Sequence, residues 1–175
     1  MPIKVTPAAF VAGVLVLPCS AIKAATRDGT RLWRGERSMN FTMNPEAENQ
    51  PPFAALIGMK LTHVSPDKVI AELPVREELN NRFGALHGGA VMALADNLGG
   101  TATIANLPKG GRTATIESKT NFFASVPVGD VARAECTPLH RGRTTMVWQT
   151  RITRGDGKLC ALVIQTQIVI PPGQN

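Results

Sequence analysis

Aromatic side chains are scarce in this chain of 175 residues, which has no tyrosine, six phenylalanines and two tryptophans. Such a composition leaves little on which nucleic-acid bases could stack. The net charge of +6 is also unevenly spread, since residues 1–38 hold six basic and two acidic residues and the remainder holds thirteen and eleven. Because nucleic-acid binding needs a basic stripe on a folded face, we expect no nucleic-acid partner.

Cysteines are few, and Cys19, Cys136 and Cys160 lie far apart without a CxxC pair or a Cys/His cluster. The odd count argues against a disulfide framework, and the spacing argues against a zinc site. Cys136 and Cys160 fall in apolar, strand-like segments, where a free cysteine behaves as a small core residue. We therefore expect no metal and a cytoplasmic protein.

A long apolar run is also missing. Residues 8–18 (AAFVAGVLVLP) are too few to span a bilayer, which takes about 20 apolar residues. They make a poor secretion signal, because the basic start is thin and no clear cleavage site follows. We expect residues 1–52 to be an extension, disordered or mis-called upstream of a start at Met39 or Met43, with an export signal in residues 1–25 as the alternative. The folded domain is predicted at residues 53–171.

Two common catalytic signatures are absent. The chain has no G-x-S-x-G element, which serine hydrolases need for their nucleophile. It has no P-loop either, since the KGGRT segment lacks the required spacing.

What the chain does have is alternation with a period close to two, interrupted by one alanine-rich segment without proline. The alternation predicts strands and the interruption predicts a helix over residues 88–106. The predicted strands cover residues 56–64, 68–75, 113–124, 131–140, 144–153 and 159–170. Because short turns join most of them, the pairing should be antiparallel. The expected class is α+β, with five to six strands that curl around one long helix or pack against a second subunit.

The same alternation assigns side chains to faces. We expect one face of the first strand to carry Ile57, Met59 and Leu61. In the strand after the helix, the expected faces are Ala114, Ile116 and Phe122 against Thr115, Glu117 and Lys119. In the last strand, the residues expected to share a face are Cys160, Leu162, Ile164, Ile168 and Ile170.

The predicted helix contains a single acid, Asp96, among apolar and small residues. An unpaired buried carboxylate is costly, so such an acid usually lies at a solvated edge or in a site. Gly99 and Gly100 follow at three and four positions, where they neighbour Asp96 on the helix surface and leave space for a ligand. The alternative is that this glycine pair serves only the contact between helix and sheet.

At the start of the helix, Gly88 and Gly89 follow His87. Backbone N–H groups there are unpaired, and without side chains in the way they can bind a carbonyl oxygen, as an oxyanion hole does. The alternative is an ordinary glycine-rich helix start. Gly88 and Asp96 are roughly 12 Å apart along a helix axis, too far to share one reacting carbonyl. An active site that uses both must therefore join two antiparallel helices of a twofold dimer.

The pattern N-x-x-G-x-L-H-G-G followed by A-D spans Asn81, Gly84, His87, Gly88 and Asp96, and it resembles the hotdog-fold acyl-CoA thioesterases. The PaaI-like branch, typified by phenylacetate-degradation enzymes, is the most similar. The resemblance implies one hotdog domain and a homodimer, possibly a dimer of dimers.

It also implies roles for single residues. Asp96 would be the catalytic base or nucleophile, and the Gly88 N–H would bind the thioester oxygen. His87 and Asn81 would position the thioester or water, and Thr115 would orient the water. Relatives with a hydroxyl residue one turn after the acid differ from this chain, which has Gly100 there.

The predicted function is hydrolysis of an acyl-CoA or aroyl-CoA thioester without a cofactor. A non-catalytic acyl-CoA-binding hotdog module is the alternative. Besides Gly89, Gly99 and Gly100, the residues predicted to contact substrate are Arg112, Arg141 and Arg143, as partners for the phosphates of coenzyme A. A solvated basic face is the alternative for each single arginine.

Overall fold

The computed structural model describes residues 10–11, 14–15 and 43–173. The chain forms two compact units, Met1–Asn40 and Phe41–Asn175. In the first unit, β1 (Phe10–Val11) pairs antiparallel with β2 (Val14–Leu15). Cys19, Met39 and most of the segment expected as an export signal lie outside the described residues, so the expectations for the extension and for the domain limits stay predictions.

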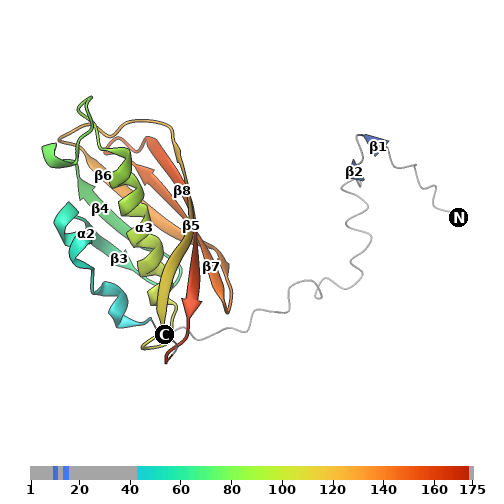
Figure 1. Cartoon of the computed structure of the whole chain (residues 1–175). Helices are drawn as coiled ribbons and strands as arrows, with labels where there is room; N and C mark the ends of the chain where they lie inside the picture. Colours follow the sequence, from blue (N-terminus) through green and yellow to red (C-terminus); the bar gives the residue numbers. More distant parts are fainter. Residues whose placement is uncertain (1–9, 12–13, 16–42, 174–175) are drawn as a thin grey trace, which may run out of the picture. The chain divides into compact units, whose positions relative to one another are not determined.

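The second unit contains one antiparallel sheet of six strands that curves around a long helix (Figure 1). The strands are β3 (Lys60–Val64), β4 (Val69–Pro74), β5 (Arg112–Phe122), β6 (Val131–Arg141), β7 (Thr145–Thr153) and β8 (Leu159–Ile170). Their order across the sheet is β3-β4-β6-β7-β8-β5. The strand β5 thus forms one edge, beside the last strand of the chain. This architecture confirms the α+β class with one central helix.

The long helix α3 (Gly88–Ala105) begins at the predicted residue and lies against the concave face of the sheet (Figure 1). Small side chains on its buried side allow the strands to approach closely. The buried residues of α3 are Val91, Leu94, Ala95, Leu98, Gly99, Thr101, Ala102, Thr103 and Ala105. Opposite them, Trp148 of β7 is fully buried, and its indole N–H donates a 2.8 Å hydrogen bond to the Thr103 hydroxyl. None of the helices in the described ranges is long and apolar enough to cross a membrane.

The first predicted strand starts too early. Residues 52–57 form a short helix, α2 (Pro52–Ile57), and β3 begins only at Lys60. Proline suits the first helical position, and Gly58 ends the helix with a left-handed φ of 80°. The prediction that Ile57 lies on a strand is therefore wrong, because proline and glycine signals override a short stretch of alternation.

The face assignment for β5 is wrong beyond Thr115. The register between β5 and β8 shifts between Thr115 and Glu117, which inserts one extra residue into the strand. Thr115 pairs with Gln167, and after the shift Phe122 pairs with the buried Ala161, so Thr115 and Phe122 lie on the same, helix-facing side. Single-residue alternation cannot reveal such a bulge.

Leu162 and the isoleucines of β8 do not form its core face. The residues of β8 that are buried toward α3 include Val163, Gln165 and Gln167, whereas Ile164 is only partly buried and Ile168 is exposed. Because side chains alternate along a strand, the residues Leu162, Ile164 and Ile168 share the opposite face. Cys160 and Cys136 are buried free thiols, as predicted.

Candidate functional site

Asp96 lies in the middle of α3 with its side chain toward the edge strand of the sheet. The hydroxyl of Thr115 on β5 donates a 2.7 Å hydrogen bond to Oδ1 of Asp96. The Nε2 group of Gln165 on β8 donates to the same oxygen at 3.1 Å. Within the described part of the chain these are the hydrogen bonds of the carboxylate, and both end on Oδ1. The second oxygen, Oδ2, has no hydrogen-bond partner among the described residues.

Two buried glutamines support this contact from behind. Gln167 donates a 2.8 Å hydrogen bond from Nε2 to the Thr115 hydroxyl and accepts one of 2.8 Å from Thr113. Gln165 and Gln167 are each only 1% exposed. Sequence reasoning missed both residues. The signal available was their spacing of two within a largely aliphatic strand, which places two amides on one face.

A cavity of about 600 Å³ lies beside Asp96. One wall comes from α3 and the start of β5, and the other from residues 47–52. The lining residues are Ala47, Asn49, Gln50, Pro51, Pro52, Asp96, Asn97, Gly100, Thr101, Ile104, Thr113, Ala114, Thr115 and Gln167. A cavity of this size can hold a ligand as large as a drug-like molecule, and here the Asp96 carboxylate lies beside it.

The two glycines after Asp96, Gly99 and Gly100, lie in different surroundings. Gly100 lines the cavity, and a Cβ built there meets no atom within 4 Å, as expected for a residue that leaves room for a ligand. Gly99 is buried and is not among the residues that line the cavity, and the space beside it holds the amide of Gln165. Contact of Gly99 with substrate stays a prediction, and in this structure the Gln165 amide fills the space beside Gly99.

The wall opposite α3 is held by a small polar network. Asn97 donates from Nδ2 to Oε1 of Gln50 at 2.5 Å, and Gln50 donates from Nε2 to the Ala47 carbonyl at 3.0 Å. Ala47 belongs to a short 3-10 helix, η1 (Pro45–Glu48), and is itself buried. Asn97 therefore fixes the position of the segment that closes the cavity on this side.

The other predicted cluster lies at the first turn of α3. His87 caps the helix, because its Nδ1 accepts a 2.9 Å hydrogen bond from the Gly89 amide. The adjacent Gly88 amide donates to no acceptor among the described residues. The ring of Phe122 lies 3.5 Å from the place of a Gly88 Cβ, so one apolar side chain covers part of this turn.

Asn81 shapes the loop that leads into α3. Its Oδ1 accepts hydrogen bonds from the amides of Phe83 at 2.8 Å and Ala85 at 3.4 Å. Gly84 takes a left-handed φ of 74° within this turn. Asn81 therefore organises the backbone just before His87, and its Nδ2 group makes no hydrogen bond to the described residues.

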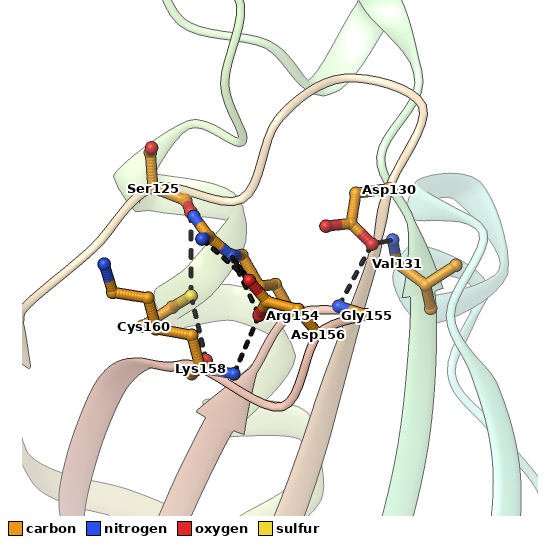
Figure 2. Close-up of polar contacts among 8 residues, drawn as sticks. All are labelled: Ser125, Asp130, Val131, Arg154, Gly155, Asp156, Lys158 and Cys160. Carbon is orange, nitrogen blue, oxygen red and sulfur yellow. Dashed lines mark hydrogen bonds and ion pairs between the residues drawn. The ribbon is translucent and has the colours of Figure 1, made fainter.

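The loop before β6 supports the same helix start. The Leu86 amide donates to the Val126 carbonyl at 2.8 Å. Figure 2 shows how Ser125, the residue before Val126, is held. Nη1 of Arg154 donates to the Ser125 carbonyl at 3.3 Å, and the other nitrogens of the Arg154 guanidinium bind Asp156. The hydrogen bond from Arg154 lowers the pKa of Asp156 to about 2. The turn between β7 and β8 thereby braces the loop that pairs with Leu86.

The structure thus divides the predicted residues into two groups. Asp96, Thr115 and Gly100 lie together at the cavity, whereas Asn81, His87, Gly88 and Gly89 lie at the first turn of α3. Eight residues of helix separate Gly88 from Asp96, roughly 12 Å along the axis. One copy of the chain does not bring the two groups to one reacting atom.

Two of the three predicted arginines lie at the ends of strands, and the third lies in a turn. Arg141, at the end of β6, forms a 2.9 Å ion pair with Asp67 and donates at 3.3 Å to the Pro66 carbonyl, so it ties down the turn between β3 and β4. Arg112 begins β5, and Arg143 is exposed in the turn between β6 and β7. Contact of these residues with phosphates stays a prediction. No group of three or more His, Cys, Asp or Glu side chains within the described ranges could hold a metal ion.

Comparison with known proteins gives a consistent result. The model of a family described as the thioesterase superfamily matches residues 83–161. The proofreading thioesterase EntH of Klebsiella pneumoniae is 32% identical over 128 residues, which are 73% of this chain and 90% of that protein. The 1,4-dihydroxy-2-naphthoyl-CoA hydrolase of Escherichia coli is 33% identical over 104 residues, 59% of this chain and 76% of that protein.

A solved structure agrees with these relatives. The thioesterase of Haemophilus influenzae superposes with a TM-score of 0.67 at 29% identity, over 70% of this chain and 85% of that one. The chain therefore belongs to the thioesterase superfamily, and its sheet and central helix are those of the hotdog thioesterases. It is a thioester hydrolase.

Proposed function

We propose that the protein hydrolyses acyl-CoA or aroyl-CoA thioesters to the free acid and coenzyme A, at two equivalent sites between two copies of the chain. The observation that carries this proposal is the environment of the Asp96 carboxylate, that is, its hydrogen bonds and its place beside the cavity. Oδ1 is held by Thr115 and Gln165, and the residue lines a cavity of about 600 Å³. Oδ2 is then the oxygen available for chemistry.

In the proposed reaction, Oδ2 of Asp96 takes a proton from water as the water oxygen attacks the thioester carbonyl carbon. The carbonyl oxygen gains negative charge, which the Gly88 amide of the second copy stabilises as an oxyanion-hole donor. Collapse of this intermediate breaks the carbon–sulfur bond, and the thiolate of coenzyme A leaves with the proton that Asp96 had taken up, which restores the carboxylate. In the alternative route, Oδ2 attacks the carbonyl carbon directly and expels coenzyme A as the thiolate. Water then hydrolyses the resulting anhydride, which frees the acid and restores the Asp96 carboxylate. Thioesters are activated enough that one carboxylate and one oxyanion donor suffice.

The sheet supports a dimer with this geometry. The strand β5 forms the edge next to β8, and most of its eleven residues are exposed. An exposed edge of this length offers unpaired N–H and C=O groups for pairing with another chain. Pairing of two β5 edges about a twofold axis would set the helices of the two copies side by side and bring Gly88 of one toward Asp96 of the other. A tetramer built from two such dimers belongs to the same proposal.

The remaining predicted residues take supporting roles in this proposal. His87, with Nδ1 engaged at the helix start, keeps Nε2 for the thioester or water, and Asn81 keeps Nδ2. Arg112, Arg141 and Arg143 are proposed contacts for the phosphates of coenzyme A. The E. coli relative is named for a CoA ester of an aromatic acid, and the PaaI-like branch is the subfamily we propose. No metal or redox cofactor takes part, and the cytoplasm is the proposed compartment.

The test is thiol release from acetyl-CoA, decanoyl-CoA and benzoyl-CoA by the wild type and by Asp96→Asn and Asp96→Ala. Removal of a general base should lower kcat by roughly 10²- to 10⁴-fold. Glu135→Gln is the matched control, because Glu135 lies on β6 between the buried residues Ala134 and Cys136 and faces away from α3. Full activity in both Asp96 variants would refute the assignment. Binding of all three esters without turnover by the wild type would favour the acyl-CoA-binding module.

A further inference from the structure

We propose that Gln165 is a positioning residue for hydrolysis: it enters the space left by Gly99 and holds the Asp96 carboxylate so that Oδ2 faces the cavity. This inference rests on the proposed function of Asp96. Gln165 lies on β8 behind the helix and does not line the cavity, so it acts through Asp96 and not on the substrate.

The contacts of Gln165 all converge on the acid. Its Nε2 group lies 3.1 Å from Oδ1 of Asp96, 3.2 Å from the main-chain oxygen of the same residue and 3.3 Å from the Thr115 hydroxyl. Two of these three atoms are pure acceptors, so the nitrogen and not the oxygen of the amide must point at them. A donor shared between the main chain and the side chain of Asp96 restricts rotation of the carboxylate.

Gly99 makes this arrangement possible. A Cβ at Gly99 would lie 2.6 Å from Cδ of Gln165 and 2.7 Å from both Nε2 and Oε1. A Cβ atom essentially never approaches a non-bonded heavy atom this closely, so any side chain at position 99 would displace the amide. Gly99 is buried on the sheet-facing side of α3, and the three heavy atoms nearest to the place of its missing Cβ all belong to Gln165.

Packing alone does not account for a glutamine here. Gln165 is 1% exposed, and its Oε1 has no hydrogen-bond partner among the described residues. A buried carbonyl without a partner lowers stability, whereas an aliphatic residue in this place would leave none. The amide therefore persists at a cost in stability, as expected for a group retained for its effect on Asp96.

The first test compares Gln165→Met with Thr150→Val in the intact enzyme. Both substitutions remove one buried polar group from the sheet, but Thr150 on β7 neither lines the cavity nor hydrogen-bonds Asp96, whereas Gln165 contacts Asp96 directly. We expect Gln165→Met to lower kcat by about tenfold or more, as for loss of a hydrogen bond to a charged group, with KM within about twofold of wild type. The melting temperature should change similarly in both variants. Equal losses of kcat in the two, or a loss that follows the melting temperature, would overturn the inference.

The second test is a double-mutant cycle between Gly99→Ala and Gln165→Ala, assayed with the best of the three CoA esters. Gly99→Ala should lower kcat severalfold when Gln165 is present and should cause no further loss when Gln165 is already alanine, because the clash is gone. An equal loss in both backgrounds would refute the role of Gly99.

Asp96→Asn, measured in parallel, separates the two proposals. Inactive Asp96→Asn with unaffected Gln165→Met would overturn only the positioning role, whereas active Asp96→Asn would overturn the proposed function itself.

Discussion

The hydroxyl of Thr115, on the edge strand of the sheet, donates a 2.7 Å hydrogen bond to Oδ1 of Asp96 in the middle of α3. These two residues lie nineteen positions apart in the sequence and on different elements. The bond ties the carboxylate to the strand that would form the dimer interface. Any shift of β5 is therefore transmitted to the acid.

Replacement of Thr115 tests the value of this bond. Thr115→Val keeps the shape of the side chain but removes the donor, and we expect kcat to fall by about ten- to hundredfold, as for a hydrogen bond to a charged group. Thr115→Ser keeps a hydroxyl and should retain most of the activity. Steady-state thiol release measures both. Similar activity of the two variants would show that the hydroxyl is not used.

His87 should have two separable roles. It caps α3 through Nδ1, and loss of a helix cap costs about 1 kcal/mol of stability. His87→Ala should therefore lower both the melting temperature and the activity. Asparagine is a good capping residue, so His87→Asn should restore the melting temperature without restoring turnover. Recovery of full turnover by asparagine would mean that the imidazole serves only as a cap.

A mixed dimer tests whether the site joins two copies. Asp96→Asn and Gly88→Val should each be inactive alone, the second because a side chain blocks the amide. When the two variants are co-expressed, half of the dimers combine them and keep one intact site of two, which predicts about a quarter of wild-type activity. A site contained within one chain would show no recovery at all, and differently tagged copies allow the mixed dimer to be isolated.

Stability at high pH should depend on Cys136. Burial raises the pKa of this thiol from 9.0 to about 12, an effect only partly offset by a hydrogen bond with Thr150. Between these values the unfolded chain loses the proton and the folded chain keeps it, so stability falls as the pH rises, by about 1.4 kcal/mol per pH unit. Below pH 9 this loss is absent.

Urea unfolding at pH 8.5 and 10.5 measures the effect, with Cys136→Ala as the comparison. The wild type should lose more stability than the variant over this interval. Parallel losses in the two proteins would show that the thiol does not contribute.

The position of the central helix and its acid could be predicted from the sequence. A glycine pair after a capping histidine begins α3, and alternation marks the strands on both sides. The distance between Gly88 and Asp96 followed from helix geometry alone, since eight residues have a nearly fixed length. These features are local, and local rules of backbone conformation suffice for them.

The environment of the acid was decided by the tertiary structure. Alternation in β8 predicts two faces, but which face meets α3 depends on the partner across it, and here the face with two glutamines is buried. In β5, a bulge set by pairing with β8 brings Thr115 and Phe122 to the same side. Gln165 and Gly99 are sixty-six positions apart, and only packing of the sheet on the helix reveals that the amide fills the space of the missing side chain. The sequence by itself determined where the carboxylate lies along the chain, and the packing of distant segments determined which of its oxygens is held.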